Sequence, residues 1–218
     1  MIISRLICLV IGYVLGLFQT GYIYGKAHHI DIREHGSGNA GTTNTLRTLG
    51  WKAGAITFIG DLCKAILAIL IAWLIFRNRY PEGVLVLQMY AGIGAVLGHN
   101  YPCYLKFKGG KGIACTSGFI LACFWQAAPV CLVLFVVAVG ITGYVSLGSI
   151  LVVISFLIQL IIFGQTGIIS IPDAYRVEVY ILGVAFTLLA LWRHRTNIKR
   201  LLTGTENRFG SSKKKEVA

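Results

Sequence analysis

The chain has 218 residues, of which 56% are hydrophobic and only 13% are charged. Charged residues make up about a quarter of an average globular protein, so this composition excludes an ordinary soluble domain and predicts an integral membrane protein. The formal net charge is +12, and in so apolar a chain the positions of the cations predict the topology.

Apolar segments at 3–25, 52–76, 84–100 and 177–192 are candidate membrane spans, because a hydrocarbon core of roughly 30 Å needs about 20 helical residues. The first segment is longer than the core of a signal peptide, so we expect it to be a spanning helix. A further stretch, 113–164, contains neither a charged residue nor a histidine. It offers helix breaks at 125–129 and 140–148.

Two strongly basic segments predict the topology. Lys106, Lys108 and Lys111 precede the uncharged stretch, and many Arg and Lys residues lie between 193 and 215. The positive-inside rule places both segments in the cytoplasm, so an even number of crossings separates them. Since 177–192 is one crossing, the uncharged stretch makes an odd number, and three fits its length. We therefore predict an all-α integral membrane protein with seven transmembrane helices, the N-terminus outside and the C-terminus cytoplasmic. Residues 1–210 would form one membrane domain and 211–218 a basic cytoplasmic tail.

Glycine and cysteine patterns predict packing rather than chemistry. Gly12/Gly16 and Gly94/Gly98 have the small-xxx-small spacing that lets helices approach closely in lipid. The six cysteines form no CxxC pair and no spacing with histidine that would close a metal site. We expect no bound metal, and the cysteines should pack as small apolar side chains.

The first polar segment on the predicted inner face, 37–47, combines hydroxyls, amides, glycines and one arginine. Successive backbone N–H groups at glycines can surround an anion, and an arginine can grip a phosphate with parallel hydrogen bonds. The alternative is a polar loop that caps the next helix. The candidate binding residues of this segment are Ser37, Gly38, Asn39, Gly41, Thr43, Asn44 and Arg47.

The second polar segment follows the third candidate span and leads into the uncharged stretch. A glycine-rich run with lysines just before a helix N-terminus suits a phosphate, although its spacing is not that of a Walker A loop. A lysine cluster that rests on anionic lipid headgroups is the alternative. Its candidate residues are His99, Lys108, Gly109, Gly110, Lys111 and Gly112.

The third polar segment follows the last span. Arg193, Asn197 and Arg200 have the spacing i, i+4, i+7, so they share a face if the helix continues, and His194 lies among them. The lysines at 213–215 suit a tail at the membrane surface.

One ionisable pair lies inside a predicted span. Asp61 and Lys64 are three residues apart in 52–76, so they can meet on one helix face. Ionisable residues within a span are functional candidates by default. A neutralised structural pair that lines or braces the site is at least as good an interpretation as a catalytic role.

Together these segments resemble the PlsY family of bacterial acyl-phosphate:glycerol-3-phosphate acyltransferases over nearly the whole chain. The motif S-G-N-x-G-x-T-N-x-x-R is matched by Ser37, Gly38, Asn39, Gly41, Thr43, Asn44 and Arg47. The motif G-H-x-x-P with F-K-G-G-K-G is matched by Gly98, His99, Pro102, Phe107, Lys108, Gly109, Gly110, Lys111 and Gly112. The motif R-H-x-x-N-I-x-R-L-x-x-G-x-E is matched by Arg193, His194, Asn197, Ile198, Arg200, Leu201, Gly204 and Glu206.

The Asp61/Lys64 pair resembles the G-D-x-x-K element of the same family. The chain departs from the family pattern at Cys115, where Thr is usual, and at Ala65, where Gly is common. Cys115 lacks the hydroxyl donor, so we assign it no role.

The resemblance implies transfer of an acyl group from acyl phosphate to the 1-hydroxyl of sn-glycerol 3-phosphate, which gives lysophosphatidic acid and inorganic phosphate, the first step of phospholipid synthesis. The site would lie at the cytoplasmic face of a bacterial inner (plasma) membrane. It would use no cofactor and no nucleic acid. Its partners would be both substrates, membrane lipids and functionally an enzyme that produces acyl phosphate.

The implied catalytic residues are Ser37, Asn39, Arg47, Lys111 and His194. The implied phosphate-binding residues are Gly38, Gly41, Thr43, Asn44, His99, Lys108, Gly109, Gly110, Gly112, Asn197 and Arg200. We expect 37–39 and 108–112 to hold one phosphate, and Arg47 with the face of His194, Asn197 and Arg200 to hold the other. The base is His194, His99 or an oxygen of the donor phosphate.

Two other classes fit parts of the sequence. A small-anion transporter would need ionisable residues at mid-membrane and broken helices in matching halves, whereas here only Asp61 and Lys64 lie within a span. A non-catalytic scaffold that binds anionic lipid would suit the basic tail, but it does not need three compact polar motifs.

Overall fold

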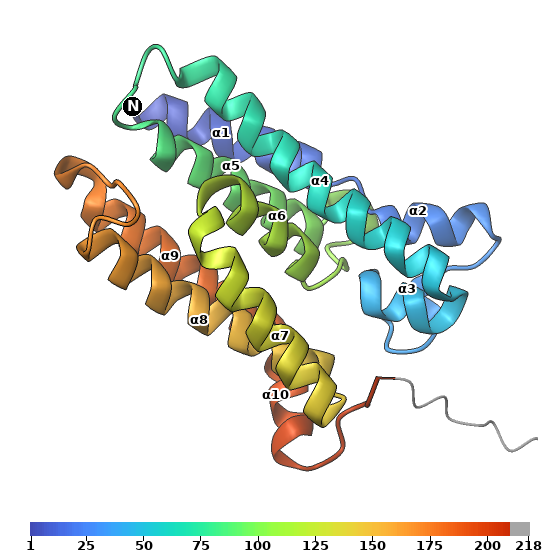
Figure 1. The fold of residues 1–218 in the computed structure, drawn as a ribbon. Coiled ribbons are helices and arrows are strands. Elements are labelled where there is room, and N and C mark those ends of the chain that lie inside the picture. The colour runs from blue at the N-terminus through green and yellow to red at the C-terminus, as the bar shows by residue number, and fades with distance from the viewer. Residues whose placement is uncertain (210–218) are drawn as a thin grey trace, which may run out of the picture.

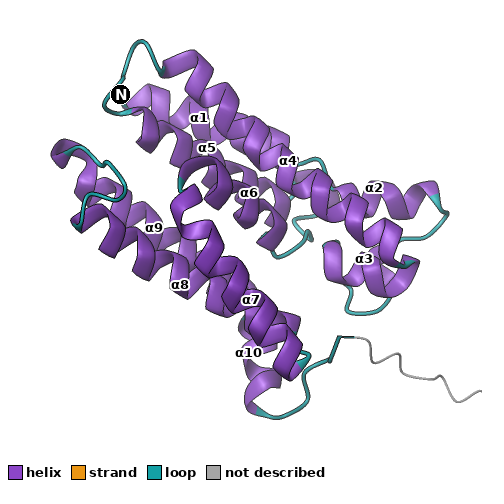
Figure 2. Ribbon diagram, in the orientation of Figure 1, coloured by secondary structure: helices purple, strands orange, loops and turns teal. Residues whose placement is uncertain are grey.

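The computed structural model describes residues 1–209, and this part of the chain is helical throughout, without a strand (Figure 2). The predicted basic tail, 211–218, lies outside the described residues. The α-helices are α1 (Ile2–Gly16), α2 (Thr20–Ala27), α3 (Thr42–Leu49), α4 (Trp51–Phe76), α5 (Val84–Asn100), α6 (Ile113–Cys123), α7 (Ala128–Thr142), α8 (Val145–Gln165), α9 (Asp173–Arg193) and α10 (Arg195–Leu202). Short 3₁₀ turns at Ile32–Glu34, Cys103–Leu105 and Trp125–Ala127 join some of them.

The helices form two groups (Figure 1). Helices α1, α4, α5 and α6 pack together, with α2 and α3 against the end of α4, while α8 packs between α7 and α9. Four buried aromatic rings join the groups: Phe119 of α6 lies 5.6 Å from Phe124, 5.8 Å from Phe156 of α8 and 4.7 Å from Phe186 of α9. Aromatic pairs at such distances pack favourably, so this cluster ties the two groups together.

Helices α1 and α5 pack closely because glycines face each other. A Cβ added at Gly12 would collide with the backbone of Ala91, and one added at Gly94 would lie 2.9 Å from the amide nitrogen of Tyr13. Gly16 and Gly98 make a similar approach one turn further on. The prediction that these glycines serve close packing is confirmed.

The predicted continuous helix 3–25 is wrong in one respect: it is broken between α1 and α2. Gln19 is fully buried at the break, and its side-chain amide donates to the carbonyls of Gly16, Gly98 and His99 at 3.1–3.3 Å. These bonds satisfy carbonyls at the ends of α1 and α5, and they join the break in α1/α2 to the start of the glycine-rich segment. The periodicity of an apolar run does not reveal such a break.

The chain has five helices long and apolar enough to cross a membrane within the described residues: Ile2–Ala27, Trp51–Phe76, Trp125–Thr142, Val145–Thr166 and Asp173–Arg193. Helices α5 and α6 are shorter, with 17 and 11 residues, and eleven residues extend only about 17 Å. The predicted breaks at 125–129 and 140–148 are confirmed, since α7 begins at Ala128 and α8 at Val145. The count of seven crossings stays a prediction.

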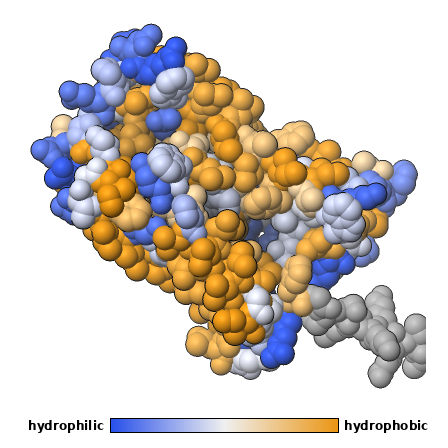
Figure 3. All heavy atoms as spheres, viewed as in Figure 1, coloured by the Kyte–Doolittle hydropathy of each residue, from blue (hydrophilic) through white to orange (hydrophobic). Residues whose placement is uncertain are grey.

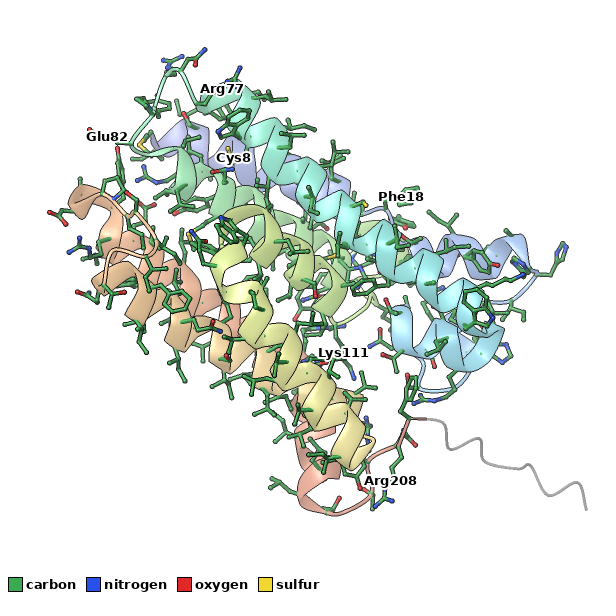
Figure 4. The ribbon with its side chains drawn as sticks, in the orientation of Figure 1. Cys8, Phe18, Arg77, Glu82, Lys111 and Arg208 are labelled. Carbon is green, nitrogen blue, oxygen red and sulfur yellow. The ribbon has the colours of Figure 1, made fainter. Side chains whose placement is uncertain are left out.

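Apolar residues cover the middle of the face shown in Figure 3, and polar residues gather at its ends. The N-terminus lies at the same end as Arg77 and Glu82, whereas α10 and Arg208 lie at the opposite end (Figures 1 and 4). The polar segments at that second end surround the candidate site.

Candidate active site

A cavity of about 160 Å³ lies where the two helix groups diverge, between α3, α4, the start of α6, α7, α8 and α10. Lys111, labelled in Figure 4, lies between the two groups. The predicted residues that line the cavity are Ser37, Asn39, Gly41, Thr43, Asn44, Arg47, Asp61, His99, Lys111, Gly112, His194, Asn197 and Arg200.

Some predicted residues do not line this cavity, namely Gly38, Lys64, Lys108, Gly109 and Gly110. Lys108 and Gly38 are exposed, while Lys64, Gly109 and Gly110 contact or support lining residues. The cavity also contains residues that were not predicted for it. They are Thr42, Phe58, Ile113, Ala114, Phe135, Val145, Ser146, Ser149, Glu206 and Asn207.

Asn44 organises the first polar segment. It is 2% exposed; its side-chain oxygen accepts from the amide of Ser37 at 2.7 Å, and its nitrogen donates to the carbonyls of Ile32 and His35 at 2.9 and 3.0 Å. Gly36, with φ +60°, must be glycine because a Cβ there would collide with the Asn44 side chain. Asn44 therefore holds the loop that presents Ser37, and its three hydrogen bonds are used within the protein.

The start of α3 faces the cavity. Asn39 accepts from the amide of Gly41 at 3.0 Å and so turns the chain into the helix, whose first turn contains Thr42 and Thr43. Amides in the first turn of a helix have no intrahelical partner and favour an anion. Arg47, one turn further along α3, also lines the cavity and is exposed. This side of the cavity thus offers helix amides, hydroxyls and a guanidinium.

The glycine-rich loop uses its own backbone differently from a loop that encloses phosphate. The amides of Gly109 and Gly110 donate to the carbonyls of Asn100 and His99 at 3.3 and 3.1 Å. A Cβ at Gly110 would collide with the His99 ring, so glycine is needed for the loop to cross it. These amides are therefore occupied, and the loop offers the cavity the Lys111 side chain and the N-terminal turn of α6.

Arg193 fixes the other side of this loop. Its Nη2 donates to the carbonyls of Gly109 and Gly110 at 3.2 and 2.6 Å, and its guanidinium lies 4.9 Å from the ring centre of Tyr101. The helix does not continue from Arg193 to Arg200, because α9 ends at Arg193 and α10 begins at Arg195, so the condition for a shared face is not met. Arg193 supports the loop, whereas Asn197 and Arg200 line the cavity.

Lys111 is the cation of the loop that enters the cavity. Its Nζ donates to Oδ1 of Asn197 in α10. Burial, together with the nearby guanidinium of Arg200, lowers the pKa of Lys111 to about 8. Both causes disfavour the ammonium form. A phosphate bound next to Lys111 would favour the ammonium form.

Glu206 closes the far side of the cavity and was not among the predicted binding residues. Its carboxylate accepts from Asn197 Nδ2 at 2.8 Å and from Arg200 Nε at 2.7 Å. Burial alone would raise its pKa, but these hydrogen bonds lower it. Only its place in the third motif indicated it, because a carboxylate is not an expected ligand of phosphate. It fixes the orientation of two groups on α10.

His194 lies at the junction of α9 and α10 and is 2% exposed. Its Nδ1 is 2.8 Å from the carbonyl of Ala190, which can only accept. Nδ1 therefore carries the proton, and Nε2 keeps its lone pair. Burial, with smaller effects from Lys111 and Arg193, lowers the pKa of His194 to about 4, so the ring is neutral at physiological pH.

The intramembrane pair meets as predicted. Lys64 Nζ lies 2.8 Å from Asp61 Oδ1 on the buried face of α4, and it also lies 2.9 Å from Nδ1 of His99 in α5. Asp61 and His99 line the cavity, and Lys64 is directly behind them. The interpretation of a pair that braces the site fits this geometry.

The arrangement can bind phosphate groups and stabilise negative charge. Arg47, Lys111 and Arg200 come from α3, the loop before α6 and α10, and all three reach one cavity. Charge-assisted hydrogen bonds from such groups are the strong ones in anion recognition. Phe58, Ile113 and Phe135 add an apolar side to the same cavity.

The glycerol-3-phosphate acyltransferase family model matches residues 6–204. A glycerol-3-phosphate acyltransferase from Alkaliphilus metalliredigens is 42% identical over 94% of this chain and 96% of its own length. The one from Clostridioides difficile is 40% identical over 97% and 98%. The crystal structure of PlsY, an integral membrane glycerol 3-phosphate acyltransferase, in its glycerol 3-phosphate form, has a TM-score of 0.82 and 35% identity over 95% of this chain and 96% of that one.

The lysophosphatidic acid form of the same PlsY protein matches with a TM-score of 0.80 and 34% identity, again over 95% of this chain and 96% of that one. The sequence and structure matches both extend over almost the whole length of the chain. This chain belongs to the PlsY family of integral membrane glycerol-3-phosphate acyltransferases.

Proposed function

We propose that this protein transfers an acyl group from acyl phosphate to the 1-hydroxyl of sn-glycerol 3-phosphate and forms lysophosphatidic acid and inorganic phosphate. The observation that carries the proposal is the convergence of Arg47, Lys111 and Arg200 on one cavity. Both substrates carry a phosphate, so the site needs more than one cation. PlsY, whose fold this chain shares, has crystal structures named for glycerol 3-phosphate and for lysophosphatidic acid.

The two phosphates would be held on opposite sides of the cavity. On one side are Ser37, Asn39, the first amides of α3 and Arg47. On the other are Lys111, Asn197 and Arg200, which already form a hydrogen-bonded group with Glu206. This grouping differs from the expected pairing of 37–39 with 108–112, because Lys111 bonds to α10 in the third segment.

The reaction needs positioning more than a protein nucleophile, because a mixed anhydride is already activated. The 1-hydroxyl oxygen bonds to the carbonyl carbon, the bond from that carbon to the phosphate oxygen breaks, and phosphate leaves with the electron pair. The hydroxyl proton goes to a base in the cavity, and the free lone pair of His194 Nε2 suits this role. Bound phosphates would raise the pKa of His194 from its low value.

The acyl chain would extend from the reacting carbon along the apolar side of the cavity, past Phe58, Ile113 and Phe135. These residues belong to α4, α6 and α7. The exposed surfaces of α4 and α7 are apolar, with Ile59 58% and Val136 58% exposed, as for helices in contact with lipid. A donor dissolved in the membrane could thus place its reactive end among the polar segments.

We further propose that seven segments, α1 with α2, α4, α5, α6, α7, α8 and α9, cross a bacterial plasma membrane with the site on the cytoplasmic side. The basic residues around the cavity support this orientation through the positive-inside rule. An enzyme that produces acyl phosphate would be its functional partner, because the donor is reactive and must be supplied on the same side.

The decisive experiment gives the purified protein glycerol 3-phosphate with synthetic acyl phosphate, acyl-CoA or acyl carrier protein loaded with an acyl chain. We expect lysophosphatidic acid and an equal amount of inorganic phosphate with acyl phosphate. Product with the thioesters but none with acyl phosphate would contradict the donor assignment.

The site is tested with matched variants. Arg47→Ala and Lys111→Ala should each lower turnover at least ~100-fold, as expected for donors that hold developing charge. Arg195→Ala and Lys52→Ala are the controls, since both side chains are exposed outside the cavity. Full activity in an Arg47→Ala/Lys111→Ala double variant would remove the proposed site.

A further inference from the structure

Lys64 is buried at the centre of a cluster that links three helices to the cavity. Asp61, Lys64 and His99 are 0%, 5% and 2% exposed. Lys64 Nζ lies 2.8 Å from Asp61 Oδ1, 2.5 Å from the carbonyl oxygen of Phe18 and 2.9 Å from His99 Nδ1. An ammonium group has three N–H donors and no acceptor, so these three contacts use all of them.

The break between α1 and α2 makes one of these contacts available. Phe18 lies in the break, where its carbonyl oxygen accepts from Lys64. Thr20, at the start of α2, donates to Asp61 Oδ1 at 3.1 Å. The irregular backbone in this predicted span thus serves the Lys64 cluster.

Two arrangements of His99 are conceivable, and the distances decide between them. In the first, Nδ1–H would donate to Asp61, as in an Asp–His pair that prepares Nε2 as a base. In the second, Nδ1 accepts from Lys64 and the proton lies on Nε2. Asp61 Oδ1 is 3.6 Å from Nδ1, beyond hydrogen-bonding range, whereas Lys64 Nζ is at 2.9 Å. Asp61 and Lys64 form a buried ion pair, so Lys64 acts as a hydrogen-bond donor toward His99.

We propose that Lys64 is a positioning residue that fixes the Nε2–H tautomer of His99, and that His99 donates a hydrogen bond to an anionic substrate oxygen and is not the base. This proposal rests on the acyl transfer proposed above. Nδ1 points to Lys64, so the ring edge that can reach the cavity is the Nε2 edge, which also packs against Gly110. No protein acceptor contacts Nε2 within residues 1–209.

His194 has the opposite tautomer on the same cavity. Its Nδ1–H donates to the Ala190 carbonyl, which leaves the Nε2 lone pair free to accept. The two histidines therefore differ in function because their buried neighbours differ: a lysine that donates behind His99 and a carbonyl that accepts behind His194. The sequence motif alone does not separate these roles.

The first test replaces each histidine with Gln, whose amide nitrogen can donate from the position of Nε2 but cannot take up a proton. His99→Gln should keep kcat/KM within about tenfold of wild type, roughly the change for one altered hydrogen bond. His99→Ala should lose about 100-fold or more. His28→Gln, an exposed histidine outside the cavity, is the control and should retain full activity.

The kinetic constants then locate the acceptor of the hydrogen bond. A loss in His99→Ala that appears as a raised KM assigns the donor to a substrate phosphate, and a loss in kcat assigns it to the oxygen of the attacked carbonyl; both outcomes support a donor. If His99→Gln is as inactive as His99→Ala while His194→Gln remains active, His99 is the base and the proposal is overturned.

The second test reads the tautomer directly and does not depend on activity. Side-chain ¹⁵N NMR of the full chain labelled at histidine, with the His99 signals assigned by their loss in His99→Gln, should show the proton on Nε2 in the wild type. Lys64→Met should shift His99 toward a mixture of tautomers, while Lys52→Met on the exposed start of α4 should not. A proton on Nδ1 in the wild type would overturn the proposal even if lysophosphatidic acid is formed. A protein that forms no product but has the Nε2–H tautomer would contradict only the acyl transfer.

Discussion

At the scale of single residues, the polar motifs contain two kinds of side chain that look alike in the sequence. Arg47 and Lys111 reach the cavity with charged groups. Asn44 also lines it, but its side chain holds the loop that presents Ser37, and Arg193 holds the glycine-rich loop before Lys111. The difference lies in their partners. Asn44 is surrounded by backbone groups of its own loop, and Arg193 by the carbonyls of a loop distant in sequence. Loss of either kind should lower activity, but through different measurable effects.

The pH dependence should report Lys111. Its pKa is lowered to about 8, first by burial and then by Arg200, so the ammonium form is present below this pH and lost above it. We expect kcat/KM for glycerol 3-phosphate to decline as the pH rises through about 8. In Lys111→Arg, the guanidinium stays charged, so this decline around pH 8 should disappear. An unchanged decline in Lys111→Arg would show that another group titrates.

Arg193→Lys tests the bracing of the glycine-rich loop. A lysine cannot reproduce the guanidinium that bonds to two carbonyls and lies over Tyr101. Hydrogen bonds to a charged group contribute about 1.5–3 kcal/mol, so we expect kcat/KM to decrease by roughly 10- to 100-fold. Arg195→Lys, with an exposed side chain over Trp192, is the control. Equal kinetics in the two variants would contradict the bracing role.

At the scale of helices, close packing through glycine positions the site. Helices α1 and α5 meet at Gly12, Gly16, Gly94 and Gly98. His99 lies in the last turn of α5, and the glycine-rich loop follows this helix. The same contact brings the break after α1 beside α4, where the Phe18 carbonyl meets Lys64. A shift of α1 against α5 would therefore disturb the site at the end of both helices.

Gly94→Val should destabilise the protein. The added side chain would lie against the backbone of α1, 2.9 Å from the Tyr13 amide nitrogen at its Cβ, and overpacking typically costs about 1–3 kcal/mol. Gly140→Val is the matched control, because no atom lies within 4 Å of a Cβ there. Thermal unfolding in detergent should show a lower Tm for Gly94→Val alone. A similar Tm for both would mean that α1 and α5 are not closely packed.

At the scale of the whole molecule, two helix groups joined by an aromatic cluster leave the cavity open at one end. The polar segments from three distant parts of the chain meet there because α3, the α5–α6 loop and α10 all lie at that end (Figure 1). The N-terminus lies at the other end. This arrangement fits a chain that crosses the membrane an odd number of times.

Thiol labelling tests the topology. A membrane-impermeant maleimide should label Asn78→Cys, in the exposed turn between α4 and α5, from outside intact cells. It should label the exposed Cys103, after α5, only in inverted vesicles. Cys103→Ser gives the background from the other cysteines. Labelling of Cys103 in intact cells would reverse the proposed orientation.

The sequence by itself determined the membrane class, the helix breaks at 125–129 and 140–148, and most residues of the cavity. Apolar length, charge and motif spacing are local properties, so they can be read along the chain. Only the tertiary structure decided that α1 and α2 are separate, that Arg193 hydrogen-bonds to the glycine-rich loop and that Glu206 hydrogen-bonds to Asn197 in the site. It also decided which partner lies behind each histidine ring, Lys64 for His99 and the Ala190 carbonyl for His194. Each of these depends on a partner distant in sequence or on the exact path of the backbone, and a pattern of residue types does not contain that information.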